Sequence, residues 1–310
     1  MAPPAVETTE GNPGAVTVPE RCGSALLGWI AEPDVRPLFY ASSVTSPSTV
    51  DDFVAAWKIG HDSKPVKSAA IPVGPQISQL PAALADNAAA LAATDQFRTQ
   101  YQPFGAAFVT VKLSELITPQ WWADTAYADE LAASLPAEDD LEGLFRFSFT
   151  EGHLAPPMLM GTNAAAFASP RRELGGLSPL RVARHSAAKV TFEFDVTPRP
   201  NWVWLVELQG LSRPLILNGV HHLLALLKAG RQEAFGLLRP AQSLQELQAI
   251  GMNLQQDPSL FKPEQLMGPC PPMLRHYLDE TITQPVNLRA VDQYMRTVIQ
   301  TDIGFIPRGA

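Results

Sequence analysis

The stretch that decides the fold is Pro214-Leu-Ile-Leu-Asn218-Gly219-Val220-His221-His222-Leu-Leu-Ala-Leu-Leu-Lys228-Ala-Gly230. A short apolar run breaks at Asn218-Gly219 and turns into an apolar helix that Gly230 ends. A strand that enters a helix through a glycine leaves backbone N–H groups pointing at one spot, where an anion such as phosphate is favoured. The stretch therefore predicts a strand from Pro214 to Leu217, a helix from Gly219 to Ala229 and an anion-binding turn between them.

Further strands are predicted on both sides of this stretch. Ala234 to Leu238 follows it and completes a βαβ-like unit. Upstream, polar and apolar residues alternate from Val190 to Val196, which indicates a half-buried strand. The apolar run from Trp202 to Leu208 indicates a buried strand. The turn residues between these two runs predict a hairpin. Alternating phenylalanines predict a strand at Phe145 to Phe149, and Phe108 to Lys112 is typical of another.

Helix starts are marked by capping residues. They lie at Thr49-Val-Asp-Asp52, at Pro81, at Asp124 and at Ser243 with Glu246. Gly60 is expected to end the first helix, and the second, which is rich in alanine, is expected to run toward Tyr101. From Glu151 to Ala188 the sequence shows little periodicity, which indicates a functional loop or short helices.

The balance of charge bears on the class of partner. The 310 residues carry a formal net charge of −8, which argues against a general nucleic-acid binder because such proteins neutralise phosphates with Lys and Arg. One basic cluster departs from this balance and holds Arg171, Arg172, Arg181, Arg184 and Lys189 against the single acid Glu173. We interpret the cluster either as a solvated loop or as a local anion-binding patch.

Composition also indicates where the protein resides. The hydrophobic fraction of 46% suits a globular chain with one large core or two modest ones. No apolar run approaches the roughly 20 residues that cross a bilayer, so no membrane contact is expected. The N-terminus lacks the parts of a secretory signal, and Cys22 and Cys270 are too few for a disulfide framework. A cytoplasmic location with free thiols is therefore expected.

Three stretches together resemble the ParB/sulfiredoxin-like superfamily. They are Val109 to Ile117, Tyr127 to Leu131 and Leu215 to Gly230. In that family a hydrophobic strand followed by Asp-Gly or Asn-Gly and then His-Arg enters a helix that ends in Gly, and the turn binds nucleotide phosphates. The resemblance implies an α+β fold with a mixed sheet, flanking helices and extra N- and C-terminal segments.

The resemblance also implies a division of the chain. We expect a disordered tail at residues 1–20, an N-terminal helical extension at 21–104, the ParB/sulfiredoxin-like domain at 105–240 with an inserted loop at 150–189, and a C-terminal extension at 241–310. After Ser243, Pro258 and Pro263 interrupt the stretch in which ParB partition proteins continue into a helix-turn-helix. That DNA-binding element is therefore not expected here.

Two residues depart from the family pattern at the turn. Val220 stands where sulfiredoxins carry their catalytic cysteine, which excludes thiol chemistry at this position. His222 stands where nucleotide-binding members carry arginine. A neutral imidazole clamps a phosphate less well than a bidentate guanidinium, so nucleotide affinity is expected to be weakened or lost unless an arginine of the basic cluster substitutes for it.

The candidate site residues gather at this turn. The expected phosphate-binding residues are Asn218, Gly219, Val220 and His221, completed by Arg171, Arg172, Arg181 and Arg184. His222 is a candidate anion ligand or proton-transfer group, or else a packed histidine. Glu115 is a candidate general base, or else an ordinary helix-start carboxylate. Adjacent histidines on a helix point about 100° apart, so no metal site is expected.

Three functions stay open on these residues. The first is a nucleotide- or phosphate-binding protein, acting as an enzyme or switch that depends on ATP or CTP with Mg²⁺. The second is a non-catalytic member of the same fold that binds a protein partner, which the missing arginine and cysteine favour. Independently of these functions, Trp121-Trp122 lies beside a turn and is expected to line a pocket or an interface. The third is a DNA-associated protein or nuclease that uses the basic cluster, against which the net charge counts.

Overall fold

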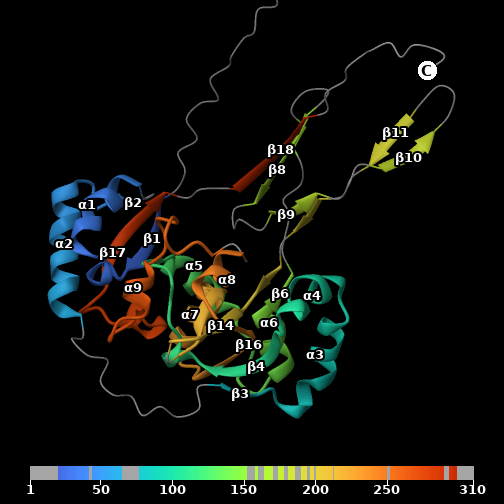
Figure 1. Cartoon of the computed structure of the whole chain (residues 1–310), viewed down its shortest axis with the longest axis horizontal. Helices are drawn as coiled ribbons and strands as arrows, with labels where there is room; N and C mark the ends of the chain where they lie inside the picture. The colour runs from blue at the N-terminus through green and yellow to red at the C-terminus, as the bar shows by residue number, and fades with distance from the viewer. Residues whose placement is uncertain are drawn as a thin grey trace, which may run out of the picture.

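The structure is a computed structural model. It describes residues 20–41, 44–64, 77–151, 158–159, 164–169, 174–177, 181–185, 190–193, 196–198, 200–211, 213–249, 252–289 and 293–298. This part of the chain is a mixed α+β structure (Figure 1). Of the tail expected at residues 1–20, all but the last residue lies outside the described ranges. Within them, no helix is both long enough and apolar enough to cross a membrane.

A five-stranded sheet forms the centre of the structure. Its strand order is β15 (Leu215–Asn218), β14 (Trp204–Leu208), β16 (Glu233–Ala241), β4 (Ala107–Lys112) and β3 (Ile77–Gln79). The β14–β16 pair is parallel and the other pairs are antiparallel. The expected strand, helix and second strand are present, but β15 and β16 are not neighbours because β14 lies between them. β15 and α7 (Val220–Lys228) thus form the crossover that joins β14 to β16.

Helices cover both faces of this sheet. Figure 1 shows α5 (Thr125–Ala133) and α7 on one side. On the other side lie α3 (Ala85–Ala92), α4 (Asp95–Gln100) and α6 (Leu141–Ser148). The larger core cluster includes the buried leucines of α7, whereas a smaller aromatic cluster joins α4 and α6 to the sheet. The sheet therefore has one aliphatic and one aromatic face.

A second sheet brings together segments that are distant in sequence. Its order is β2 (Val44–Ser46), β17 (Gln284–Arg289), β1 (Glu20–Ala25) and β5 (Trp122–Ala123). β1 and β17 pair in antiparallel fashion along their whole length. α1 (Glu32–Ala41) and α2 (Val50–Ser63) lie beside this sheet in Figure 1.

The first predicted helix is confirmed at its start and longer than expected at its end. Thr49 caps α2 by accepting a hydrogen bond from the N–H of Asp52. The helix continues through Gly60 to Ser63. Gly60 packs against the backbone of Gly28 in η1 (Leu27–Trp29), where a Cβ on Gly28 would collide with the Gly60 carbonyl. Gly60 thus allows the two backbones to approach closely, and it does not end the helix.

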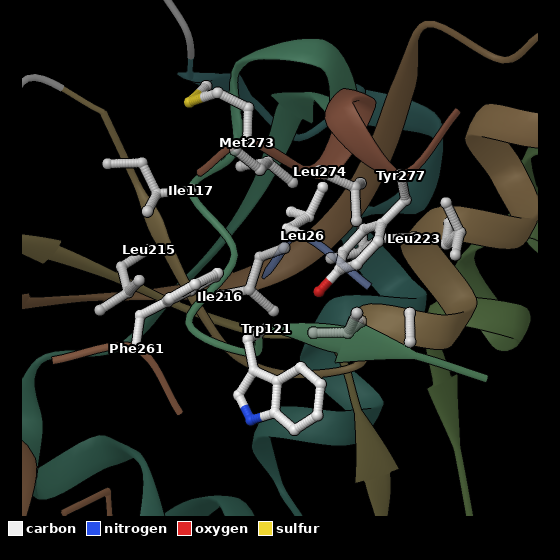
Figure 2. Close-up of a cluster of buried hydrophobic side chains, with 14 of the residues drawn as sticks. Leu26, Ile117, Trp121, Leu215, Ile216, Leu223, Phe261, Met273, Leu274 and Tyr277 are labelled. Atoms are coloured by element: carbon white, nitrogen blue, oxygen red, sulfur yellow. The ribbon is translucent and has the colours of Figure 1, made fainter. Parts of the chain in front are cut away.

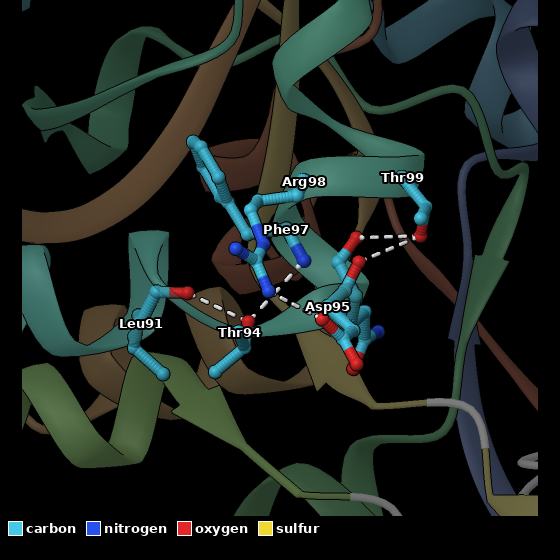
Figure 3. A network of polar contacts seen from close by, with 7 residues as sticks. Leu91, Thr94, Asp95, Phe97, Arg98 and Thr99 are labelled. Atoms are coloured by element: carbon cyan, nitrogen blue, oxygen red, sulfur yellow. Dashed lines mark hydrogen bonds and ion pairs between the residues drawn. The ribbon is translucent and has the colours of Figure 1, made fainter.

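The alanine-rich segment after Pro81 is divided into shorter helices. It forms η2 (Ala82–Leu84), α3 and α4, followed by η3 (Gln102–Phe104). The break lies at Thr94, whose hydroxyl donates to the carbonyl of Leu91 and accepts the N–H of Phe97 (Figure 3). One threonine thus closes α3 and caps α4, which the helix propensity of alanine did not reveal.

The strand expected at Phe145 to Phe149 is wrong, because this segment is helical up to Ser148. Asp140 caps α6 by accepting the N–H of Gly143. Phe145 and Phe149 are four residues apart and both contact Phe108 in the aromatic cluster. A spacing of two residues along phenylalanines also fits a helix that buries two sides. Only β6 (Phe149–Thr150) is extended, and it pairs with β13 (Asn201–Trp202).

The hairpin expected between Val190 and Leu208 is also wrong. β11 (Val190–Glu193) pairs with β10 (Arg181–His185), and β12 (Val196–Pro198) pairs with β9 (Leu174–Leu177). β8 (Ala164–Ser169) lies between β7 (Met158–Leu159) and β18 (Gln293–Val298). The segment interpreted as an inserted loop at 150–189 therefore contains strands in its described parts.

The C-terminal segment contributes to the main core. It contains α8 (Leu244–Ala249), which confirms the helix expected after Ser243, then α9 (Pro263–Leu266) and η5 (Leu274–Leu278). Figure 2 shows Met273, Leu274 and Tyr277 packed with Ile117 and Leu215 of distant segments. Ile117, which follows η4 (Leu113–Glu115), bridges to both Leu215 and Met273.

Candidate functional site

The turn predicted to bind an anion is present between β15 and α7 and is tightly packed. Gly219 precedes α7 with φ +91°, and a Cβ at this position would lie 3.0 Å from the Cα of Val203. Both facts require glycine, because other residues rarely adopt this backbone conformation. The carbonyl of Gly219 accepts the N–H of Leu223, as expected for the first turn of a helix.

The polar side chains before the helix are used inside the fold. The Asn218 amide nitrogen donates to the carbonyl of Trp202 (2.9 Å) and to the side-chain oxygen of Asn201 (3.2 Å). These bonds tie the end of β15 to β13. Asn218 therefore acts as a link between strands, and its expected contact with an anion stays a prediction.

His221 joins the starts of two helices. Its Nε2 accepts the backbone N–H of Asp124 at 3.0 Å, and its ring lies 5.5 Å from that of Tyr127. Asp124 in turn caps α5 by accepting the N–H of Tyr127. An imidazole nitrogen that accepts a hydrogen bond carries no proton, so this contact uses the neutral form of His221.

His222 and Val220 point into the core. His222 is 3% exposed and its ring lies 5.0 Å from that of Phe147. Val220 is also buried. This position agrees with the interpretation of His222 as a packed histidine and leaves it poorly placed to contact a ligand from solvent.

Glu115 lies in a buried cluster of charges. Its Oε2 atom accepts a hydrogen bond from the Nε of Arg213 at 2.7 Å, and its Oε1 atom lies 3.6 Å from the Nη1 of Arg275. Glu115 and Arg213 are both buried. The carboxylate compensates the buried charge of Arg213, whereas the side chain of Arg275 is partly exposed. The arrangement fits a structural ion pair better than a general base, and sequence reasoning missed Arg213 because its partner is 98 residues away.

The basic cluster is not brought to the turn in the described residues. Arg171 and Arg172 lie outside the described ranges. Arg181 and Arg184 are exposed on β10, where Arg181 lies 3.9 Å from Glu193 of the neighbouring strand. Figure 1 shows β10 and β11 well separated from α7. Arg181 and Arg184 therefore do not close over the N-terminus of α7.

A different surface of the central sheet presents hydrogen-bond donors. Tyr101 packs against both Trp202 and Trp204, with ring centroids 5.1 and 5.0 Å apart. The indole Nε1 atoms of Trp202 and Trp204 are buried and have no hydrogen-bond partner within the described residues. Trp202 is core, as expected, whereas Trp204 is half-buried.

Arg239 extends this donor-bearing face. Trp204 is opposite Leu237 and Val206 is opposite Arg239 in the parallel β14–β16 pair, so Trp204 and Arg239 share one face of the sheet. Arg239 is only 3% exposed, and its guanidinium carbon lies 4.5 Å from the centre of the Phe104 ring. Phe104 belongs to η3, one turn after Tyr101. We call Arg239, Trp202 and Trp204 the donor face.

The guanidinium of Arg239 is weakly partnered for a buried charge. Its Nε donates to the carbonyl of Pro240 at 3.4 Å, and its Nη2 lies 3.5 Å from a carboxylate oxygen of Glu246. Its Nη1 is buried and has no partner in the described part of the chain. Burial lowers the pKa of Arg239 and the nearby Glu246 opposes this shift, but an arginine stays charged in either case.

Comparison of the chain with models of protein families, with curated proteins and with solved structures found no match. The superfamily resemblance therefore depends on its three sequence stretches and stays a prediction. Arg239 was absent from the sequence prediction because the strand was taken to end at Leu238. The signal was present, since Phe235, Leu237 and Arg239 alternate along one strand face.

A groove lies between α1 and the segment from Leu254 to Gln265. Its volume is about 210 Å³, and its lining includes the buried rings of Trp121 and Phe261. An ion pair between Asp34 and Lys262 (2.6 Å) lies at its edge. Trp121 therefore lines a pocket, as one of its two interpretations expected, and its Nε1 donates to the carbonyl of Pro258.

Proposed function

We propose that this protein binds a phosphate-bearing or similar oxyanionic small molecule, and that the donor face supplies the binding atoms. The observation that carries the proposal is the buried Nη1 of Arg239, which lacks an acceptor among the described residues. The sequence favours phosphate binding at Gly219. The proposal keeps that class of ligand and moves the site to the opposite, aromatic face of the sheet.

The chemistry of the donor face defines the ligand. A guanidinium and an indole N–H can only donate, so the group that satisfies them must be an acceptor. A buried donor without a partner costs about 1–3 kcal/mol, and more when it is charged. Phosphate and carboxylate oxygens match a guanidinium in charge and in planar, two-point geometry. An oxyanion is therefore the complementary ligand.

The proposal assigns binding and no catalytic step. Around the turn, Asn218 and His221 already make hydrogen bonds within the fold, and His222 is packed against Phe147. Glu115 is held by Arg213. These side chains are engaged in holding the sheet, α5 and α7 together, which supports a non-catalytic binding protein.

Calorimetric titration with named anions tests the proposal. The probes are inorganic phosphate, acetate, and ATP or CTP with Mg²⁺, each added to the full chain. Arg239→Met and Trp204→Phe remove donors while keeping apolar bulk, and we expect each to weaken binding about 10- to 100-fold. Arg184→Ala removes an exposed arginine on β10 and serves as the matched control with unchanged affinity.

Two results would overturn the proposal. One is the absence of heat with every probe at millimolar concentration, which would leave the non-catalytic protein-partner interpretation as the surviving function. The other is binding that Arg239→Met and Trp204→Phe leave unchanged, because the anion would then sit elsewhere. Thermal unfolding of each variant shows whether a loss of binding reflects a loss of fold.

A further inference from the structure

Glu246 is an acidic side chain that lies against the buried guanidinium of Arg239. One carboxylate oxygen lies 3.5 Å from Nη2 of Arg239, and the other accepts the backbone N–H of Gln242 at 3.3 Å. The side chain is 42% exposed, whereas that of Arg239 is 4% exposed. Glu246 therefore reaches from solvent toward a charge that is almost completely buried.

The contact between the two side chains is loose. Hydrogen bonds between a guanidinium and a carboxylate are normally about 2.7–2.9 Å long, clearly shorter than the 3.5 Å seen here. The other oxygen of the same carboxylate accepts the backbone N–H of Gln242 before α8, so the side chain is held between two donors. Loose geometry and partial exposure both make the pair easy to replace with a better acceptor.

Two partly exposed side chains, Glu246 and Phe104, cover Arg239. Glu246 lies on α8, a short helix held on the core by the buried side chain of Leu247. Phe104 lies over the face of the guanidinium and is 42% exposed. Nη1 of Arg239 is shielded from solvent, so an external oxyanion reaches it only when one of these side chains is displaced.

We propose that Glu246 is a built-in competitor for the anion site, so that a bound oxyanion takes over Arg239 and releases the Glu246 carboxylate to solvent. This inference rests on the proposed function of the donor face. Release of Glu246 also breaks its bond to the N–H of Gln242, which loosens the start of α8. Anion binding is thereby coupled to the segment that follows β16.

Charge removal at position 246 tests the competition. Glu246→Gln keeps the length of the side chain and an acceptor for Gln242 but loses the negative charge. We expect it to tighten binding of inorganic phosphate by up to about fivefold, the range set by a partly exposed ion pair. Glu246→Asp shortens the side chain by one methylene and should shift affinity in the same direction.

A matched control separates this effect from the general loss of an acid. Glu142→Gln removes an exposed glutamate that pairs with Arg146 at 3.9 Å on α6, far along the chain from α8. It lowers the net negative charge by the same amount, so it reports any non-specific gain in phosphate affinity. We expect its affinity to equal that of the wild-type chain.

Hydrogen exchange gives a second readout that affinity alone does not. In the wild-type chain, phosphate should speed exchange of the Gln242 amide, because its acceptor is released. The amide of Phe97, capped by Thr94 in α4, should not respond and serves as the internal reference.

The outcomes distinguish the two proposals. The proposal that Glu246 competes with the anion is supported by three results together. The Glu246 variants bind phosphate more tightly, Glu142→Gln binds as the wild-type chain does, and phosphate speeds exchange of the Gln242 amide. Binding that Arg239→Met abolishes but Glu246→Gln leaves unchanged or weakens overturns the competitor and keeps the proposed function. Failure of the wild-type chain and of Glu246→Gln to bind any anion overturns both, and equal gains in Glu246→Gln and Glu142→Gln show a charge effect only.

Discussion

The Nε2 atom of His221 accepts the backbone N–H of Asp124 at 3.0 Å, so the first turn of α7 is bonded to the residue that caps α5. This contact fixes two helices relative to each other on the aliphatic face of the sheet. It also engages the Nε2 atom of the imidazole next to the predicted anion turn within the fold.

Replacement of His221 tests this contact between α5 and α7. His221→Ala leaves the N–H of Asp124 without its acceptor and removes the ring contact with Tyr127, so we expect a loss of about 1–3 kcal/mol in the free energy of unfolding. His221→Gln offers a side-chain oxygen in a similar place and should recover part of the loss. Urea denaturation measures both, and equal stability of the two variants would show that the acceptor is unimportant.

The sequence predicted helix starts correctly where one capping residue and a nearby backbone N–H determine them. Thr49 and Asp124 cap the helices that they were expected to cap, because each needs only a backbone N–H three residues ahead. Thr94 does the same, but its cap is hidden within an alanine-rich segment of high helix propensity. Capping is thus predictable when the helix starts after a clear break.

Pairing between distant segments was not predictable in the same way. Nothing near Leu215 indicates that β14, and not β16, is its neighbour, because the pairing depends on which strands the whole sheet assembles. The Phe145 segment was misassigned because a period of two along phenylalanines also fits a helix that buries two sides. Glu115 looked catalytic in isolation since its partner Arg213 is remote in sequence.

The glycine before α7 gives a prediction with an internal control. Gly219 and Gly210 have nearly the same φ, +91° and +95°, but an added Cβ at Gly219 would meet Val203 whereas one at Gly210 would meet open space. Gly210→Ala should cost about 1 kcal/mol from backbone strain alone. Gly219→Ala should cost a further 1–3 kcal/mol or so from crowding. Similar losses in chemical denaturation would contradict the packed turn.

Loss of Glu115 should destabilise the protein because it leaves a buried positive charge. Glu115→Gln removes the partner of Arg213, and we expect a cost of about 3–5 kcal/mol. The double variant with Arg213→Met removes both charges and should be more stable than Glu115→Gln alone. Glu142→Gln, which breaks an exposed pair, should cost less than about 1 kcal/mol. If the double variant is no more stable than Glu115→Gln, the loss of stability does not come from the unpaired charge of Arg213.

His276 predicts how stability depends on pH. Its ring stacks on Trp29 at 4.9 Å, and its Nδ1 accepts the N–H of Met273. Burial, with a smaller effect from the positive charge of Arg275, lowers the pKa of His276 from 6.5 to about 4 in the folded chain. As the pH falls, His276 is therefore protonated in the unfolded chain before it is protonated in the folded chain. The contribution of His276 is complete above pH 6.5 and is lost as the pH falls toward 4.

The size of this effect follows from the difference between the two pKa values. A shift from 6.5 to about 4 corresponds to a loss of about 3 kcal/mol on acidification, at 1.36 kcal/mol per pKa unit. His276→Phe keeps a ring against Trp29 but cannot titrate. It should start less stable at pH 7, because the N–H of Met273 loses its acceptor, and should then lose about 3 kcal/mol less than the wild-type chain by pH 4. Unfolding free energies at a series of pH values measure these slopes, and parallel curves for wild type and His276→Phe would mean that His276 is protonated equally in both states.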